Sequence, residues 1–102
     1  MTIFQGDQYN IPIEITRSGQ QQSVDSVSKL EVIFAGMRKE YPGEVFEQDG
    51  VFYFPLSQEE TMSLAENRYN LSVRPMFTDN TVEGWLSAGS IKVRAIEGAE
   101  VL

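Results

Sequence analysis

Apolar and polar side chains alternate along much of the chain, and this period of two constrains the fold more than any other feature. The alternation runs through residues 11–15, 30–35, 51–56 and 69–77. Successive side chains of a β-strand point to opposite faces of the sheet, so each segment is expected to be a strand with one buried face. The core residues that these four strands predict are Ile13, Val32, Phe54 and Val73.

Turn residues separate the strands. Asp49-Gly50 lies between residues 44–48 and 51–55, and a two-residue Asp-Gly loop is typical of a type I′ hairpin, in which both central residues need a positive φ. Pro42-Gly43 predicts another turn just before this hairpin. Pro12 lacks the N–H group that an interior strand donates, so the strand containing it is expected at an edge or a bulge.

One helical signal interrupts the strands. Ser57-Gln58-Glu59-Glu60 matches the capping box, in which the serine oxygen and the glutamate side chain satisfy each other's backbone N–H groups. We expect one or two helical turns over residues 57–65, closed near Asn67. Tyr69 follows where β-sandwiches often hold a tyrosine whose hydroxyl bonds back to the backbone.

These elements predict an all-β fold: a β-sandwich of about seven strands, with one short helix before the penultimate strand. A small barrel is the alternative. The length of 102 residues supports a single domain, 1–102. Its core is expected over about residues 3–95, and the tail from Glu97 is expected to be frayed.

The chain contains no cysteine and no histidine, and its 8 basic residues against 15 acidic ones give a net charge of −7. Thiolate chemistry and the usual general base are therefore missing. A serine–lysine pair would need a desolvated lysine, but Lys29, Lys39 and Lys92 are all expected at the surface. We expect no enzyme activity, catalytic residue, metal or cofactor, although loop carboxylates that converge on calcium are left open.

The same composition also indicates whether the chain binds nucleic acids or membranes. Nucleic acids are bound mainly through Lys and Arg, so an acidic chain is expected to have no nucleic-acid partner. No apolar run approaches the roughly 18 residues that suggest a membrane span, so no membrane partner is expected either.

The candidate interaction residues are two aromatic residues and a glutamine-rich loop, residues 18–28. Tyr53 is expected to point away from the core, because Phe52 and Phe54 take the inward face. Trp85 is expected in the core or covering one end of the sandwich, with stacking on a sugar as the alternative. The candidate interaction surface consists of Tyr53, Trp85, Gln20, Gln21 and Gln22.

Several segments together resemble one family. They are Gln5-Gly6-Asp7, Val24-Asp25-Ser26-Val27, Asp49-Gly50-Val51-Phe52, Phe54-Pro55-Leu56-Ser57-Gln58-Glu59-Glu60-Thr61 and Tyr69-Asn70-Leu71-Ser72-Val73-Arg74. Over about residues 3–95 the chain is similar to the small immunoglobulin-like domain of structural proteins of tailed phages and prophages, including the N-terminal domain of upper baseplate proteins.

The resemblance implies an immunoglobulin-like β-sandwich with a non-catalytic, structural role. It implies a virion component of the tail or baseplate, assembled in the bacterial host cytoplasm, that docks on other phage structural proteins; a homo-oligomer is a further expectation. The alternative is a stand-alone carbohydrate-binding or adhesin-like module. A sugar binder requires an exposed aromatic platform beside polar loops, whereas an assembly subunit requires an apolar patch or a free sheet edge.

Overall fold

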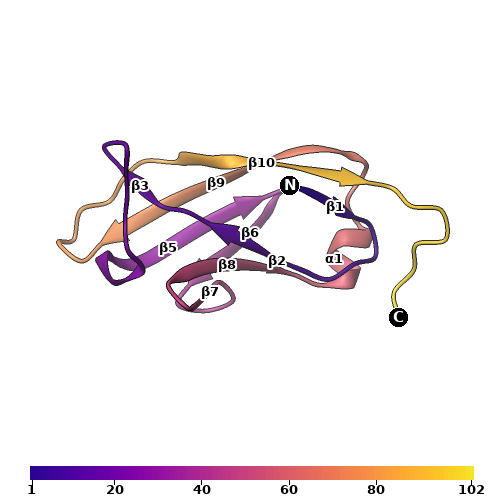
Figure 1. The fold of residues 1–102 in the computed structure, drawn as a ribbon, viewed down its shortest axis with the longest axis horizontal. Coiled ribbons are helices and arrows are strands. Elements are labelled where there is room, and N and C mark those ends of the chain that lie inside the picture. Colours follow the sequence, from indigo (N-terminus) through magenta and orange to yellow (C-terminus); the bar gives the residue numbers. More distant parts are fainter.

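The structure is a computed structural model that describes residues 1–102, and most of the chain lies in β-strands (Figure 1). The elements in chain order are β1 (Thr2–Phe4), β2 (Tyr9–Ile13), β3 (Thr16–Arg17), β4 (Gln20–Gln21), the 3-10 helix η1 (Val24–Ser26), β5 (Val27–Phe34), β6 (Met37–Tyr41), β7 (Phe46–Gln48), β8 (Val51–Leu56), α1 (Gln58–Met62), β9 (Asn67–Phe77) and β10 (Leu86–Arg94).

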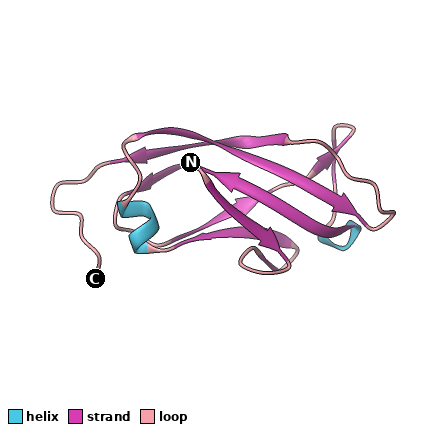
Figure 2. Ribbon diagram, turned by 180° about the vertical axis from the view of Figure 1, so that it is seen from behind, coloured by secondary structure: helices cyan, strands magenta, loops and turns pink.

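The strands form three sheets. The larger has five strands in the order β1-β10-β9-β5-β6, the smaller has three in the order β2-β8-β7, and β3 pairs only with β4. All pairs are antiparallel except β1 with β10, which run parallel. The molecule is elongated, with extents of 48 × 22 × 20 Å, and α1 lies at the end from which the C-terminal tail leaves (Figure 2).

The two main sheets share one core. Eighteen buried apolar residues form a single cluster, to which both sheets contribute. The rings of Phe34 on β5 and Phe54 on β8 meet edge to face, with centroids 6.0 Å apart. The predicted core residues Ile13, Val32, Phe54 and Val73 are all at most 3% exposed, which confirms them. The arrangement is compatible with an all-β sandwich.

The predicted turn and edge are confirmed. Asp49 and Gly50 have φ values of 52° and 80°, and Gln48 pairs with Val51 directly across the turn. Pro12 lies on β2, which is an edge strand of the smaller sheet. The missing N–H group of Pro12 therefore does not interrupt the interior of a sheet.

The capping box is also confirmed. The Glu60 N–H group donates to Ser57 Oγ at 3.2 Å, and the Ser57 N–H group donates to Glu60 Oε1 at 2.9 Å. The helix ends at Met62, however, and Asn67 begins β9 instead of closing the helix. The Tyr69 hydroxyl donates to the Ala65 carbonyl at 2.8 Å, which is the backward bond expected of this tyrosine.

Three expectations need correction. Strands β1 and β6 were not expected, and residues 20–21 belong to β4 instead of a loop. Lys39 was expected at the surface but is only 7% exposed. Its position on β6 is opposite Val32, so its side chain points into the core. Its ammonium donates to the Pro55 carbonyl at 2.6 Å and to Glu60 at 2.9 Å, which satisfies the buried charge.

Candidate functional site

The structure brings three of the five candidate residues together. Tyr53, Gln21 and Gln22 line a hollow of about 210 Å³ beside β2, whereas Gln20 lies next to the hollow in the chain without lining it. Trp85 does not line this hollow. The candidate interaction residues therefore lie in two separate regions of the surface, one at this hollow and one at Trp85.

The groups in this hollow are already partly engaged. The Tyr53 ring stacks on Phe46, with centroids 5.5 Å apart and planes 26° apart, so one face of the ring is covered. The Gln22 side-chain amide donates to the Gln20 carbonyl at 3.2 Å. What remains is a half-buried tyrosine beside glutamine amides, an arrangement that can contact a small polar ligand by stacking and hydrogen bonding.

Trp85 lies on the other side of the molecule, before β10. It is 44% exposed, which excludes the core among the positions expected for it and leaves a covering or contact position. The guanidinium carbon of Arg38 lies 5.6 Å from the centroid of its ring, which is a cation–π contact. Since Arg38 is on β6, this contact places the indole with the larger sheet.

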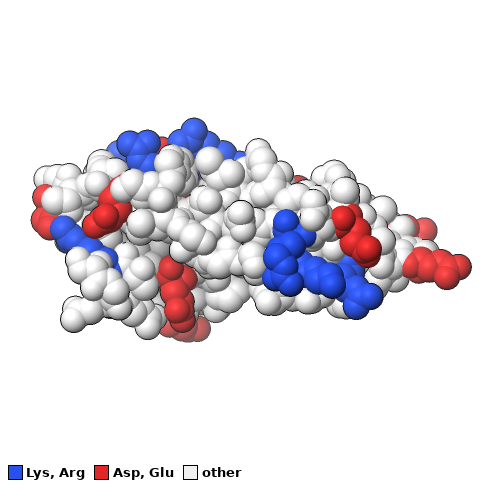
Figure 3. All heavy atoms as spheres, turned by 90° about the horizontal axis from the view of Figure 1, so that it is seen from above, with Lys and Arg blue, Asp and Glu red and all other residues white.

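The outer face of that sheet carries most of the chain's positive charge. Alternation and register place these charged residues there: Lys29, Glu31, Arg38, Glu40, Arg68, Arg74, Lys92 and Arg94. Six bases against two acids give this basic face a charge of +4, which leaves −11 for the rest of a chain whose net charge is −7. Figure 3 shows Lys and Arg gathered in one group nearer the C-terminal tail, with others along the upper margin.

Four bases of this face have no acidic partner. Arg38 and Arg74 reach Glu31 at 2.6 and 4.0 Å, but no ion pair includes Lys29, Arg68, Lys92 or Arg94. Lys29 lies on β5, and we call the other three residues, which lie on β9 and β10, the basic triad. Lys92 lies directly opposite Arg68 in the ladder between β9 and β10. Like charges at opposite positions destabilise a sheet, so the triad does not contribute to stability through its charges.

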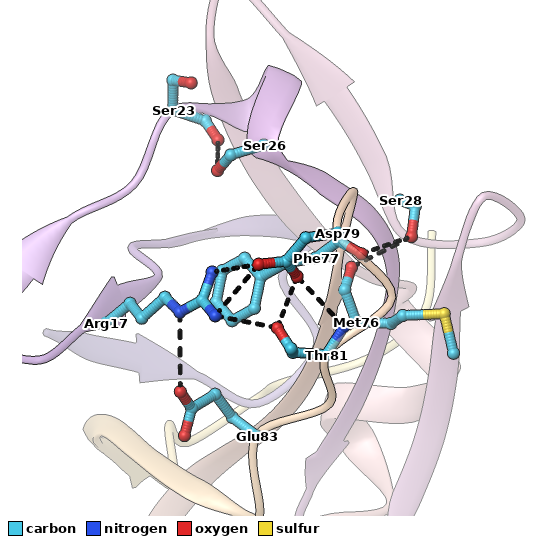
Figure 4. Close-up of polar contacts among 9 residues, drawn as sticks. All are labelled: Arg17, Ser23, Ser26, Ser28, Met76, Phe77, Asp79, Thr81 and Glu83. Atoms are coloured by element: carbon cyan, nitrogen blue, oxygen red, sulfur yellow. Dashed lines mark hydrogen bonds and ion pairs between the residues drawn. The ribbon is translucent and has the colours of Figure 1, made fainter.

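A second charged cluster holds one end of the molecule together (Figure 4). The Arg17 guanidinium donates to Asp79 at 3.2 Å and to Thr81 at 2.9 Å, and it lies 4.5 Å from the centre of the Phe77 ring. Hydrogen bonds from the Thr81 hydroxyl and backbone, helped by Arg17, lower the pKa of Asp79 below its usual value. This cluster ties β3 to the turn after β9 and so fixes the start of the glutamine-rich loop.

No group of three or more Asp, Glu, His or Cys side chains lies close enough together to hold a metal ion. The structure has no helix whose length and apolar character would let it cross a membrane. The chain matches no protein-family model, no curated protein and no solved structure.

Proposed function

We propose that this chain is a non-catalytic, immunoglobulin-like module of a tailed phage or prophage. It is a virion component of the tail or baseplate, assembled in the host cytoplasm, and it docks on other phage structural proteins. The sequence motifs described above are the basis for the phage assignment, and the strand order and the basic face support a docking module.

The strand order supports the immunoglobulin-like assignment. In immunoglobulin domains strands B, E and D lie side by side in one sheet, and strands G, F and C lie side by side in the other. The order β2-β8-β7 corresponds to B, E and D, and β10-β9-β5 corresponds to G, F and C. Strand β6 takes the place of the extra strand C′ of variable-type domains. The hydroxyl of Tyr69 on β9 corresponds to the tyrosine at the start of strand F.

The observation that carries the docking function is the basic face. An exposed sheet face with a charge of +4, in a chain of net charge −7, is a strong local departure from the average surface. The like charges of Lys92 and Arg68 in the triad cost stability, and no ion pair inside the molecule compensates for them. Complementary charge on a partner would remove that cost and would steer the encounter between the two proteins.

The virion assignment is tested on purified particles. Antibodies raised against this chain are used to probe phage particles that are induced from the source strain and banded on a density gradient. We expect the chain to co-band with the tail proteins at a fixed ratio, while an abundant cytoplasmic host protein does not. If the chain stays with the host protein and is missing from intact particles, the assignment is wrong.

The hollow at Tyr53 favours one second candidate, a carbohydrate-binding module. Its test is a glycan array, with Tyr53→Ala as the site variant and Trp85→Ala as the matched control on the other sheet. Binding of one class of glycan that Tyr53→Ala removes and Trp85→Ala keeps would support the sugar binder. Equal signals for the parent and Tyr53→Ala would rule out this hollow as the site.

A further inference from the structure

We propose that copies of this chain associate head to tail, with the basic triad of one copy against an acidic segment of the next. The acidic segment is residues 40–49, which contain four acids and no base: Glu40, Glu44, Glu47 and Asp49. All four are exposed, and none forms an ion pair within the molecule. One chain thus carries two unneutralised surfaces of opposite sign.

The sheet order keeps these two surfaces apart within one molecule. The triad lies on β9 and β10, whereas the acidic segment begins on β6, at the edge of the same sheet, and continues to the turn after β7. Neighbouring strands lie about 4.8 Å apart, so β6 is separated by about 10 Å from β9, which carries Arg68, and by about 14 Å from β10, which carries Lys92 and Arg94. The Debye length at physiological salt is about 8 Å. Within one copy the two surfaces are therefore too far apart to neutralise each other.

Between two copies the same charges can approach to contact distance. Because the triad and the acidic segment are different surfaces, this contact is heterologous, and each added copy leaves one of each surface free. Association then continues into a ring or a filament instead of stopping at a dimer. The charged side chains of Arg38 and Glu40 on the edge strand β6 oppose direct strand-to-strand pairing there, so the contact is made by side chains.

The test uses the purified chain alone, so its outcome does not depend on whether the chain belongs to a virion. Sedimentation velocity is measured over a range of concentrations at about 50 mM and about 500 mM salt. We expect the average sedimentation coefficient to rise with concentration at low salt and to fall back to that of the monomer at high salt. A chain that stays monomeric at low salt and millimolar concentration would overturn the proposal.

Two charge-reversed variants locate the contact. The triad variant is Lys92→Glu/Arg94→Glu, and the segment variant is Glu40→Lys/Glu44→Lys. None of these four side chains makes a hydrogen bond or an ion pair within the molecule, so the fold is retained, which circular dichroism verifies. Each variant alone should lose self-association by at least about ten-fold.

The mixture of the two variants gives the decisive result. The triad variant keeps an intact acidic segment and the segment variant keeps an intact triad, so together they can form one native contact. We expect an equimolar mixture to stop at a one-to-one complex. The control Glu97→Lys/Glu100→Lys makes the same change in net charge as the segment variant but in the tail, and it should associate like the parent. If both reversed variants associate as the parent does, the triad and the segment are not the contact.

Discussion

Glu60 links the helix cap to the buried charge of Lys39, and its replacement by alanine is the sharpest test of the packing described above. The Glu60 carboxylate accepts from the Ser57 N–H group at 2.9 Å and from the Lys39 ammonium at 2.9 Å. Lys39 lies under this carboxylate with only 8% of its side chain exposed, against 31% for Glu60. Without the carboxylate, the ammonium keeps a single hydrogen-bond partner, the Pro55 carbonyl, beside its cation–π contact with the Phe54 ring.

The expected cost follows from the two lost bonds. A hydrogen bond to a charged group contributes about 1.5–3 kcal/mol. Because about a third of the Glu60 side chain is in contact with water, each bond is taken at the lower end of this range, about 1.5 kcal/mol. The loss of both bonds in Glu60→Ala should therefore lower the free energy of unfolding by about 3 kcal/mol. Each kcal/mol corresponds to about 4–8 °C in a domain of this size, so the melting temperature should fall by about 12–24 °C.

Thermal unfolding followed by circular dichroism measures this fall. Glu59→Ala is the matched control, since Glu59 is the adjacent acid in the same helical turn but is exposed, and its side chain makes no hydrogen bond or ion pair. The control loses only the interaction of a charge with the helix N-terminus, about 0.3–1 kcal/mol. If Glu60→Ala melts within a few degrees of Glu59→Ala, the Lys39 pair does not hold the helix on the sheet, and the reasoning is refuted.

Three further predictions concern stability. Burial alone would raise the pKa of Glu60, but the hydrogen bonds from Ser57 and Lys39 outweigh burial and lower the pKa below its usual value of 4.5. Glu60 therefore adds stability above pH 4.5 that is lost as the pH falls. In a pH series of melting curves, the melting temperature of Glu60→Gln should fall less on acidification than that of the parent. Tyr69→Phe removes one hydrogen bond and should lower the melting temperature by about 4–8 °C in calorimetry. An unchanged melting temperature would show that this hydrogen bond does not stabilise the fold. Val73→Asp buries an unpaired carboxylate, which costs several kcal/mol out of about 5–15, and a chain that still melts cooperatively near the parental temperature would contradict the core assignment.

Local sequence signals were enough for much of the fold. The Asp49-Gly50 turn and the Ser57 capping box depend on residues within four positions of each other, so the sequence alone contains their full pattern. Strand β6 was not recognisable because its inward position is occupied by Lys39, which breaks the apolar alternation. Strand β1 has only three residues, too few to show a period.

The charged surfaces could not be predicted in the same way. The six bases of the basic face are scattered over residues 29–94, and only the pairing register places them on one face. The hydrophobicity of Trp85 could not distinguish a core position from a covering one, because its exposure depends on the position of the loop before β10. Tyr53 was correctly expected to point away from the core, because that expectation needed only the alternation along β8.

The parallel pairing of β1 with β10 determines how the molecule bears mechanical load. Hydrogen bonds from Lys92 N to Met1 O and from Gln5 N to Arg94 O, both 3.1 Å, bracket this pair. Tension applied at residues 1 and 95 slides the two strands along each other, so these bonds are loaded together and must break together. Tension at residues 67 and 94, at one end of the antiparallel pair β9 and β10, opens that ladder one bond at a time. In single-molecule pulling the first geometry should therefore unfold at the higher force, and equal forces would show that β1 carries no load.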